Sequence, residues 1–226
     1  PPSQAQSQKQ PSGGIPARVL QSPATPSRPA KTKVEAEESE EKRLQKYQLR
    51  SNDLPQPDGE KVKVAFLTHI RLIGGLPEAT SVLKVPDAKI LKNFRENFAN
   101  EDSLTSQQNG GELLIPDSSV KVYSYGPATQ DDRRRTRTQI GQVEEHAVEY
   151  IRIELARFGL PIWGPNFLES PYSLYNSACR IVALDTFKQA LKTGAYDFLD
   201  LKRKINLRKY ATRLDLLIKI YDHIIH

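Results

Sequence analysis

Two long amphipathic segments joined by a short linker constrain this fold more than any other feature of the sequence. In the first, apolar residues recur at steps of three and four, which predicts a helix over about residues 138–158. Its apolar stripe is Ile140, Val143, Ala147, Ile151, Leu155 and Phe158. Gly159 and Pro161 predict where it ends. We expect the second helix to begin near Ser170, a good cap followed by proline, and to end at Gly194.

A basic run directly precedes the first of these helices. It consists of Arg133, Arg134, Arg135 and Arg137. Guanidinium groups beside the unpaired N–H groups of a helix start form an anion site, for which phosphate is a common ligand. Asp185 lies at the edge of the apolar face of the second helix, where a carboxylate needs a partner. We expect Arg180 or an arginine of the basic run to be that partner. Asp185 would then be either a structural ion-pair member or the residue that orients a phosphate-binding arginine.

The whole sequence predicts a mainly α protein: a single helical domain with one small β-hairpin and a long disordered or extended N-terminal arm. Residues 1–55 are rich in Pro, Gln and Ser and hold one aromatic residue, Tyr47, so they cannot bury enough apolar surface to offset chain entropy. We therefore expect a flexible arm over 1–55. A helical core follows over 56–200, and a basic C-terminal helical segment over 201–226.

Within the core, the local patterns differ in clarity. Residues 61–73 alternate like a strand in their first half and have helical spacing in their second half, so both structures are open. Pro86 and Asp87 predict the start of a helix. Residues 112–115 and 120–125 favour strands, and the turn chemistry of the Pro-Asp-Ser-Ser sequence between them predicts a β-hairpin.

Composition excludes several functional classes. The formal net charge of +6 and the pI of about 9.3 favour a polyanionic partner. The single cysteine excludes a disulfide framework within one chain, and no apolar run approaches the ~18 residues of a membrane span. The four histidines form no metal-binding motif. We expect no metal, no cofactor and no enzymatic activity, because no acid–base constellation is evident.

Three segments carry a resemblance to a known family. They are 136–140 (Thr-Arg-Thr-Gln-Ile), 147–151 (Ala-Val-Glu-Tyr-Ile) and 180–187 (Arg-Ile-Val-Ala-Leu-Asp-Thr-Phe). With the expected hairpin, their order resembles the coat proteins of flexuous filamentous plant viruses, nearest to the potyvirus type, over about residues 109–190. The chain departs from the family pattern in two spacings: Arg137 precedes Gln139 by two positions rather than one, and Arg180 precedes Asp185 by five rather than four.

The resemblance implies a capsid subunit without enzymatic activity, located in the virion and the host cytoplasm. Single-stranded RNA would bind in a groove near Arg137 and Asp185 without regard to base sequence. The N-terminal arm would lie on a neighbouring subunit, so that copies of the chain form a helical filament. The alternative is a cellular adaptor whose disordered arm and basic helix dock on an acidic protein, with the arginine run as a solvated face or a localisation signal.

Overall fold

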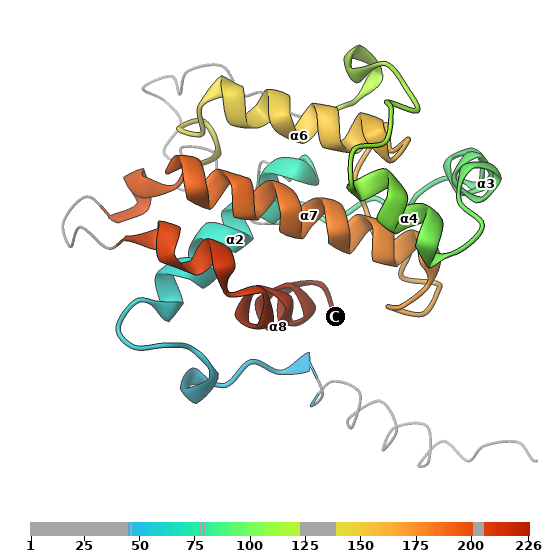
Figure 1. The fold of residues 1–226 in the computed structure, drawn as a ribbon. Helices are drawn as coiled ribbons and strands as arrows, with labels where there is room; N and C mark the ends of the chain where they lie inside the picture. Colours follow the sequence, from blue (N-terminus) through green and yellow to red (C-terminus); the bar gives the residue numbers. More distant parts are fainter. Residues whose placement is uncertain (1–44, 46, 77, 79, 123–138, 201–205) are drawn as a thin grey trace, which may run out of the picture. The chain divides into compact units, whose positions relative to one another are not determined.

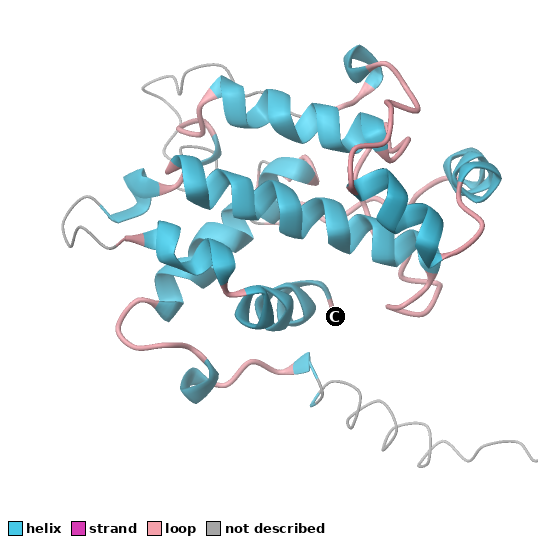
Figure 2. Ribbon diagram, in the orientation of Figure 1, coloured by secondary structure: helices cyan, strands magenta, loops and turns pink. Residues whose placement is uncertain are grey.

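The computed structural model describes residues 45, 47–76, 78, 80–122, 139–200 and 206–226 of the chain. All of them belong to one compact unit. Its α-helices are α2 (Gly59–Ile73), α3 (Ala88–Asn97), α4 (Glu101–Gln108), α6 (Glu145–Arg157), α7 (Leu174–Thr193) and α8 (Leu214–Ile225). The 3₁₀-helices are η1 (Ser51–Asp53), η2 (Asp117–Ser119), η3 (Asp197–Asp200) and η4 (Leu207–Thr212). The described ranges contain helices and loops but no strand (Figure 2), so the prediction of a mainly α protein is confirmed.

Helix α7 is the element on which the others pack (Figure 1). It contacts α2, α3, α4, α6, α8 and η4. Its apolar side chains therefore pack against neighbours on several sides of the helix and not on one face alone. Phe187 of α7 stacks on Phe66 of α2, with ring centroids 4.2 Å apart. The linker before α7 buries Trp163 completely, and its indole Nε1 donates a hydrogen bond to the backbone oxygen of Cys179 (2.9 Å). The linker and the helices on either side of it therefore share one core.

Helix α6 begins later than the periodicity predicts. The expected start near residue 138 lies outside the described residues, and the chain turns at Gly141. Glu144 then has an extended ψ of 144°, and regular helix begins after it. The end of the helix agrees with the prediction, because Gly159 has a φ of 65° directly after the last turn. Ile140 is still buried, although it precedes the turn.

Helix α7 has a different N-cap from the one expected. Ser173, not Ser170, caps it: the Ser173 hydroxyl accepts a hydrogen bond from the backbone N–H of Asn176 (3.3 Å). Ser170 and the proline after it form the preceding turn. Serine is a preferred N-cap residue, so the sequence alone permits either position. Ser173 is the N-cap because its backbone is extended and its side chain accepts the hydrogen bond. The predicted end at Gly194 is confirmed by its left-handed conformation, with a φ of 82°.

The predicted β-hairpin is wrong for the described residues. Residues 112–122 contain η2 and no strand. Some of their backbone N–H groups bind carbonyl groups at the end of α6 and in the loop after it, and those of Ser119 and Val120 bind the nearby carbonyls of Pro116 and Asp117, so no strand ladder forms. The bonds to α6 and its loop run from Leu114 N and Ile115 N to Ala156 O (3.1 and 3.3 Å), and from Lys121 N to Pro161 O (2.8 Å). Residues 123–125, the end of the second expected strand, lie outside the described residues.

Two local predictions in the first half of the core are settled. The ambiguous segment 61–73 is helical, and α2 buries Val62, Phe66 and Ile73 on its inner face. The helix expected after Pro86 is α3. Asp87 is its N-cap, and a side-chain oxygen of this residue accepts a hydrogen bond from Ile90 N (2.8 Å).

Buried polar groups connect α2 to α7 through His69. Its Nδ1 lies 2.8 Å from the Tyr196 hydroxyl, and its Nε2 lies 2.8 Å from Thr186 Oγ1. The Thr186 hydroxyl donates to the carbonyl of Val182 (2.6 Å), so it accepts from His69. The imidazole is therefore the neutral tautomer with its proton on Nε2. Burial lowers the pKa of His69 to about 3.

Both ends of the described chain pack into this unit. Leu54 is 3% exposed and Leu49 packs on the core, although both lie within the expected arm. At the other end, α8 contacts α2 and α7, and η4 contacts α7. Packing therefore continues through the last residues of the expected arm, and residues 206–226 are part of the core. Residues 1–44 and 201–205 lie outside the described residues.

Candidate nucleic-acid interface

Asp185 and Arg180 are the residues of the predicted phosphate site that the structure describes. Asp185 projects from α7, and its side chain is 22% exposed. Its Oδ1 accepts from the Lys188 ammonium (2.9 Å), and its Oδ2 accepts from the side-chain amide of Gln108 in α4 (2.5 Å). Asp185 is thus a member of an ion pair, which is one of the two roles expected for it. The described partners hold the carboxylate between α4 and α7.

Helix α6 adds a phenol and a second ion pair to this region. Glu154 is 5% exposed, and its Oε1 accepts from Arg157 Nη1 (2.7 Å). Burial is the main cause that raises the pKa of Glu154, and Arg157 opposes it. The Tyr150 hydroxyl lies within hydrogen-bonding reach of Glu154. Burial, then Glu154 and Asp185, raise the pKa of Tyr150 to about 12, so the phenol keeps its proton at neutral pH.

A pocket of about 190 Å³ opens beside these groups, between α6 and α7. Its walls come from the first two turns of α6 and the last two turns of α7: His146, Ala147, Tyr150, Thr186, Gln189, Ala190 and Thr193. Tyr150 belongs to both the pocket and the polar cluster. Aromatic rings, an amide and hydroxyl groups can stack on a flat polar ligand and form hydrogen bonds with it.

The structure does not bring Arg180 and Asp185 together. Arg180 lies over the ring of Tyr172, with its Cζ 5.5 Å from the centroid, and its charge acts on His226. Five positions along a helix turn the side chain by roughly 140°, so the two residues face different neighbours. The predicted ion pair between Asp185 and Arg180 is therefore wrong. Among the described residues, Lys188 is the cation that pairs with Asp185. Arg133, Arg134, Arg135 and Arg137 lie outside the described residues.

Sequence reasoning missed two partners of Asp185 for different reasons. Lys188 stands three positions after Asp185, and this helical spacing makes an ion pair possible. The signal was thus present in the sequence. Gln108 is 77 positions away and belongs to a helix whose own pattern is weak. No local signal identifies that contact.

Three comparisons with known proteins give no support for any family. No protein-family model, no curated protein and no solved structure matches the chain. The resemblance to filamentous-virus coat proteins therefore remains a prediction. Among the described residues, no three His, Cys, Asp or Glu side chains are grouped in a way that could hold a metal ion. No helix in the described ranges has the length and apolarity needed to cross a bilayer.

Proposed function

We propose that the chain is a structural subunit that polymerises into a helical filament and packages single-stranded RNA through sequence-independent phosphate contacts. The observation that carries this proposal is the pocket beside the first turns of α6, the helix that follows the basic run in sequence. Ile140 is 2% exposed and anchors the chain before that helix.

The groups around the pocket suit a sugar-phosphate backbone with accessible bases. Arg133, Arg134, Arg135 and Arg137 supply the phosphate contacts, which carry no base specificity. Lys188 adds a cation, and Asp185 positions it on α7. Tyr150 and His146 offer ring faces for stacking, which every base accepts.

Polymerisation completes the proposed function. Each subunit needs only weak RNA binding, because bound neighbours raise the effective concentration along the strand. A head-to-tail contact that does not close into a ring extends into a filament. In this proposal the arm before residue 45 makes that contact on the next subunit, in the virion and in the host cytoplasm.

The double variant Arg135→Ala/Arg137→Ala tests the RNA role. We expect it to lose RNA-filled filaments in negative-stain images, and its ratio of absorbance at 260 nm to 280 nm should fall to that of pure protein. Its circular dichroism should match that of the native chain, because neither arginine is expected to be part of the core.

The matched control is Arg208→Ala/Arg213→Ala, which also removes two arginines. Both are exposed and pair with Asp197 and Asp215 respectively. We expect this control to retain RNA. RNA-filled filaments of native length from the Arg135→Ala/Arg137→Ala variant would refute the proposal. Wild-type protein that purifies without RNA and binds an acidic protein instead would support the adaptor alternative.

A further inference from the structure

One polar side chain in the pocket between α6 and α7 has no partner for its hydrogen-bonding groups among the described residues. It is the amide of Gln189 in α7, a residue that is half-buried. The backbone oxygen of Gln189 accepts a hydrogen bond from the Thr193 hydroxyl (3.2 Å), but its side-chain amide forms no hydrogen bond with any described group. A partly desolvated amide without a partner costs free energy, so a ligand that forms hydrogen bonds with it gains affinity. Gln189 therefore offers a donor and an acceptor to an incoming ligand.

Each of the other polar side chains that line this pocket has a partner in the protein. They are Tyr150, Thr186, Thr193 and His146. The Tyr150 hydroxyl lies within hydrogen-bonding reach of Glu154. Nδ1 of His146 lies 3.1 Å from the carboxylate of Glu144. The rings of Tyr150 and His146 can therefore cover the flat faces of a ligand, whereas Gln189 can bind its polar edge.

The size of the pocket fits one planar heterocycle. Its volume of about 190 Å³ is smaller than the roughly 300–1,000 Å³ of clefts that bind drug-sized ligands. Ala147 and Ala190 add only methyl groups to its walls. The Watson–Crick edge of every RNA base presents a donor beside an acceptor, as an amide does. Because an amide that turns by about 180° exchanges its donor and acceptor, Gln189 can pair with either order.

We propose that this pocket holds one nucleobase of the packaged RNA in each subunit, and that the Gln189 amide pairs with the edge of that base whatever its identity. The inference rests on the proposed packaging of RNA and adds the subsite that holds the base. Phosphate contacts position the strand, and the inserted base adds affinity without selecting a sequence. A pocket that accepts every base is compatible with packaging that does not depend on sequence.

The variant Gln189→Glu tests the role of the amide in the full chain, because a carboxylate at neutral pH only accepts hydrogen bonds. Cytosine presents an amino donor at the position where uracil presents a carbonyl acceptor. We expect the native chain to bind oligocytidylate and oligouridylate of equal length with dissociation constants within about 3-fold of each other. In the variant, the ratio of the two constants should shift by about 10-fold in favour of oligocytidylate. The added charge repels both oligomers alike, so its general effect cancels in the ratio.

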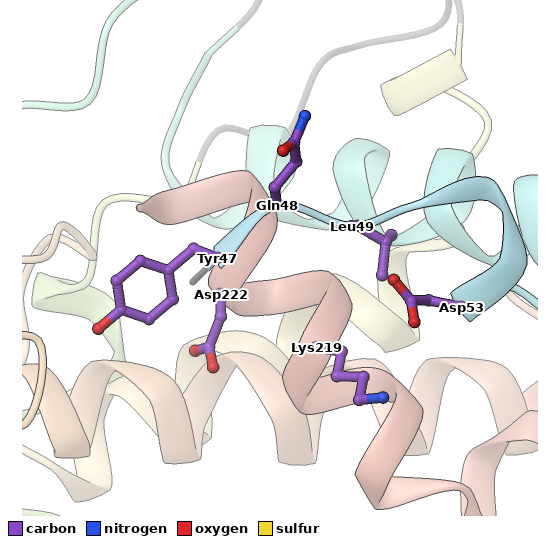
Figure 3. Close-up of a pocket in the computed structure, with 6 residues that line it drawn as sticks. All are labelled: Tyr47, Gln48, Leu49, Asp53, Lys219 and Asp222. Carbon is purple, nitrogen blue, oxygen red and sulfur yellow. The ribbon is translucent and has the colours of Figure 1, made fainter. Parts of the chain in front are cut away.

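The matched control is Gln48→Glu, which adds the same charge at a different pocket. That pocket, of about 230 Å³, is lined by the segment that precedes α2 and by α8 (Figure 3). Its lining includes the carboxylates of Asp53 and Asp222, which repel a phosphate backbone. We therefore expect no base to bind there, and the ratio of the two dissociation constants should equal that of the native chain.

An abasic oligomer of the same length separates failure of this inference from failure of the proposed function. We expect the native chain to bind it with the same salt dependence as oligouridylate but about 10-fold more weakly, because no base stacks in the pocket. The nucleobase pocket is overturned, with RNA packaging intact, if the abasic oligomer binds as tightly as oligouridylate. The same conclusion follows if Gln189→Glu leaves the ratio unchanged or if Gln48→Glu shifts it equally. If none of these oligomers binds at any salt concentration, the packaging proposal fails, and the nucleobase pocket fails with it.

Discussion

At the scale of single residues, the contacts of one carboxylate, that of Asp185, and of one imidazole, that of His69, have testable consequences. Asp185 holds Lys188 and Gln108, and His69 holds Tyr196 and Thr186. The first contact is partly exposed at the proposed interface, and the second is sealed in the core. Removing the negative charge of Asp185 should therefore change RNA binding, whereas protonating His69 should lower the stability of the fold.

If Asp185 acts by positioning Lys188, the two residues form one functional unit. Asp185→Asn and Lys188→Met should each weaken RNA binding by roughly 3- to 10-fold, and the double variant should be no weaker than Lys188→Met alone. The measurement is a titration with single-stranded RNA at several salt concentrations. Tighter binding by Asp185→Asn would show that this carboxylate only repels phosphate.

The core imidazole predicts a loss of stability in acid. The folded pKa of His69 is about 3, below its ordinary value of 6.5, so the unfolded chain binds more protons between these values. Stability is therefore present above pH 6.5 and is lost as the pH falls toward 3. From pH 7 to pH 5 the loss is about 2 kcal/mol for this residue.

Urea unfolding at both pH values measures that loss, with His69→Gln as the comparison. The difference between the two pH values should shrink by about 2 kcal/mol in the variant. Nitrogen-15 NMR gives an independent check, because the His69 ring should keep its proton on Nε2 alone at pH 5. A His69 ring that titrates near pH 6.5 would contradict the buried network.

At the scale of elements, Ser173 caps α7 and Ser170 does not, although the sequence does not distinguish the two serines. Ser173→Ala should lower the free energy of unfolding by about 1 kcal/mol, because the N–H of Asn176 loses its acceptor. Ser170→Ala is the matched control. Its hydroxyl accepts only an exposed bond from Tyr172 N (3.3 Å) among the described contacts, so its cost should stay below about 0.5 kcal/mol. Equal costs in denaturant unfolding would contradict the assignment.

The elements also show which features a sequence can predict. Helical periodicity and glycine ends are local, so the C-terminal ends of α6 and α7 and the cap at Asp87 could be predicted, whereas the start of α6 was predicted too early. The hairpin could not be judged locally, because the backbone of residues 112–122 binds carbonyls near Ala156 and Pro161. The Gln108–Asp185 contact of the candidate site could not be predicted either, because it joins residues that are 77 positions apart in the sequence.

At the scale of the whole molecule, the boundary between the N-terminal arm and the folded core can be located by truncating the chain. Deleting residues 1–44 should leave the free energy of unfolding unchanged, whereas deleting residues 1–55 should lower it by about 3 kcal/mol, because Leu49 and Leu54 leave the core. Urea unfolding of the two truncated chains checks this difference. Both truncations should stop filament growth if the arm links subunits, and long filaments from either would show that the arm is dispensable.

The burial of Trp163 has a practical consequence for all of these experiments. It is the only tryptophan in the chain, and it sits against the backbone of α7 at Cys179, away from water. Its fluorescence is therefore a blue-shifted, single-site signal of intact packing around the central helix. A red shift of that emission in any variant described above would therefore report collapse of the fold rather than loss of a surface contact.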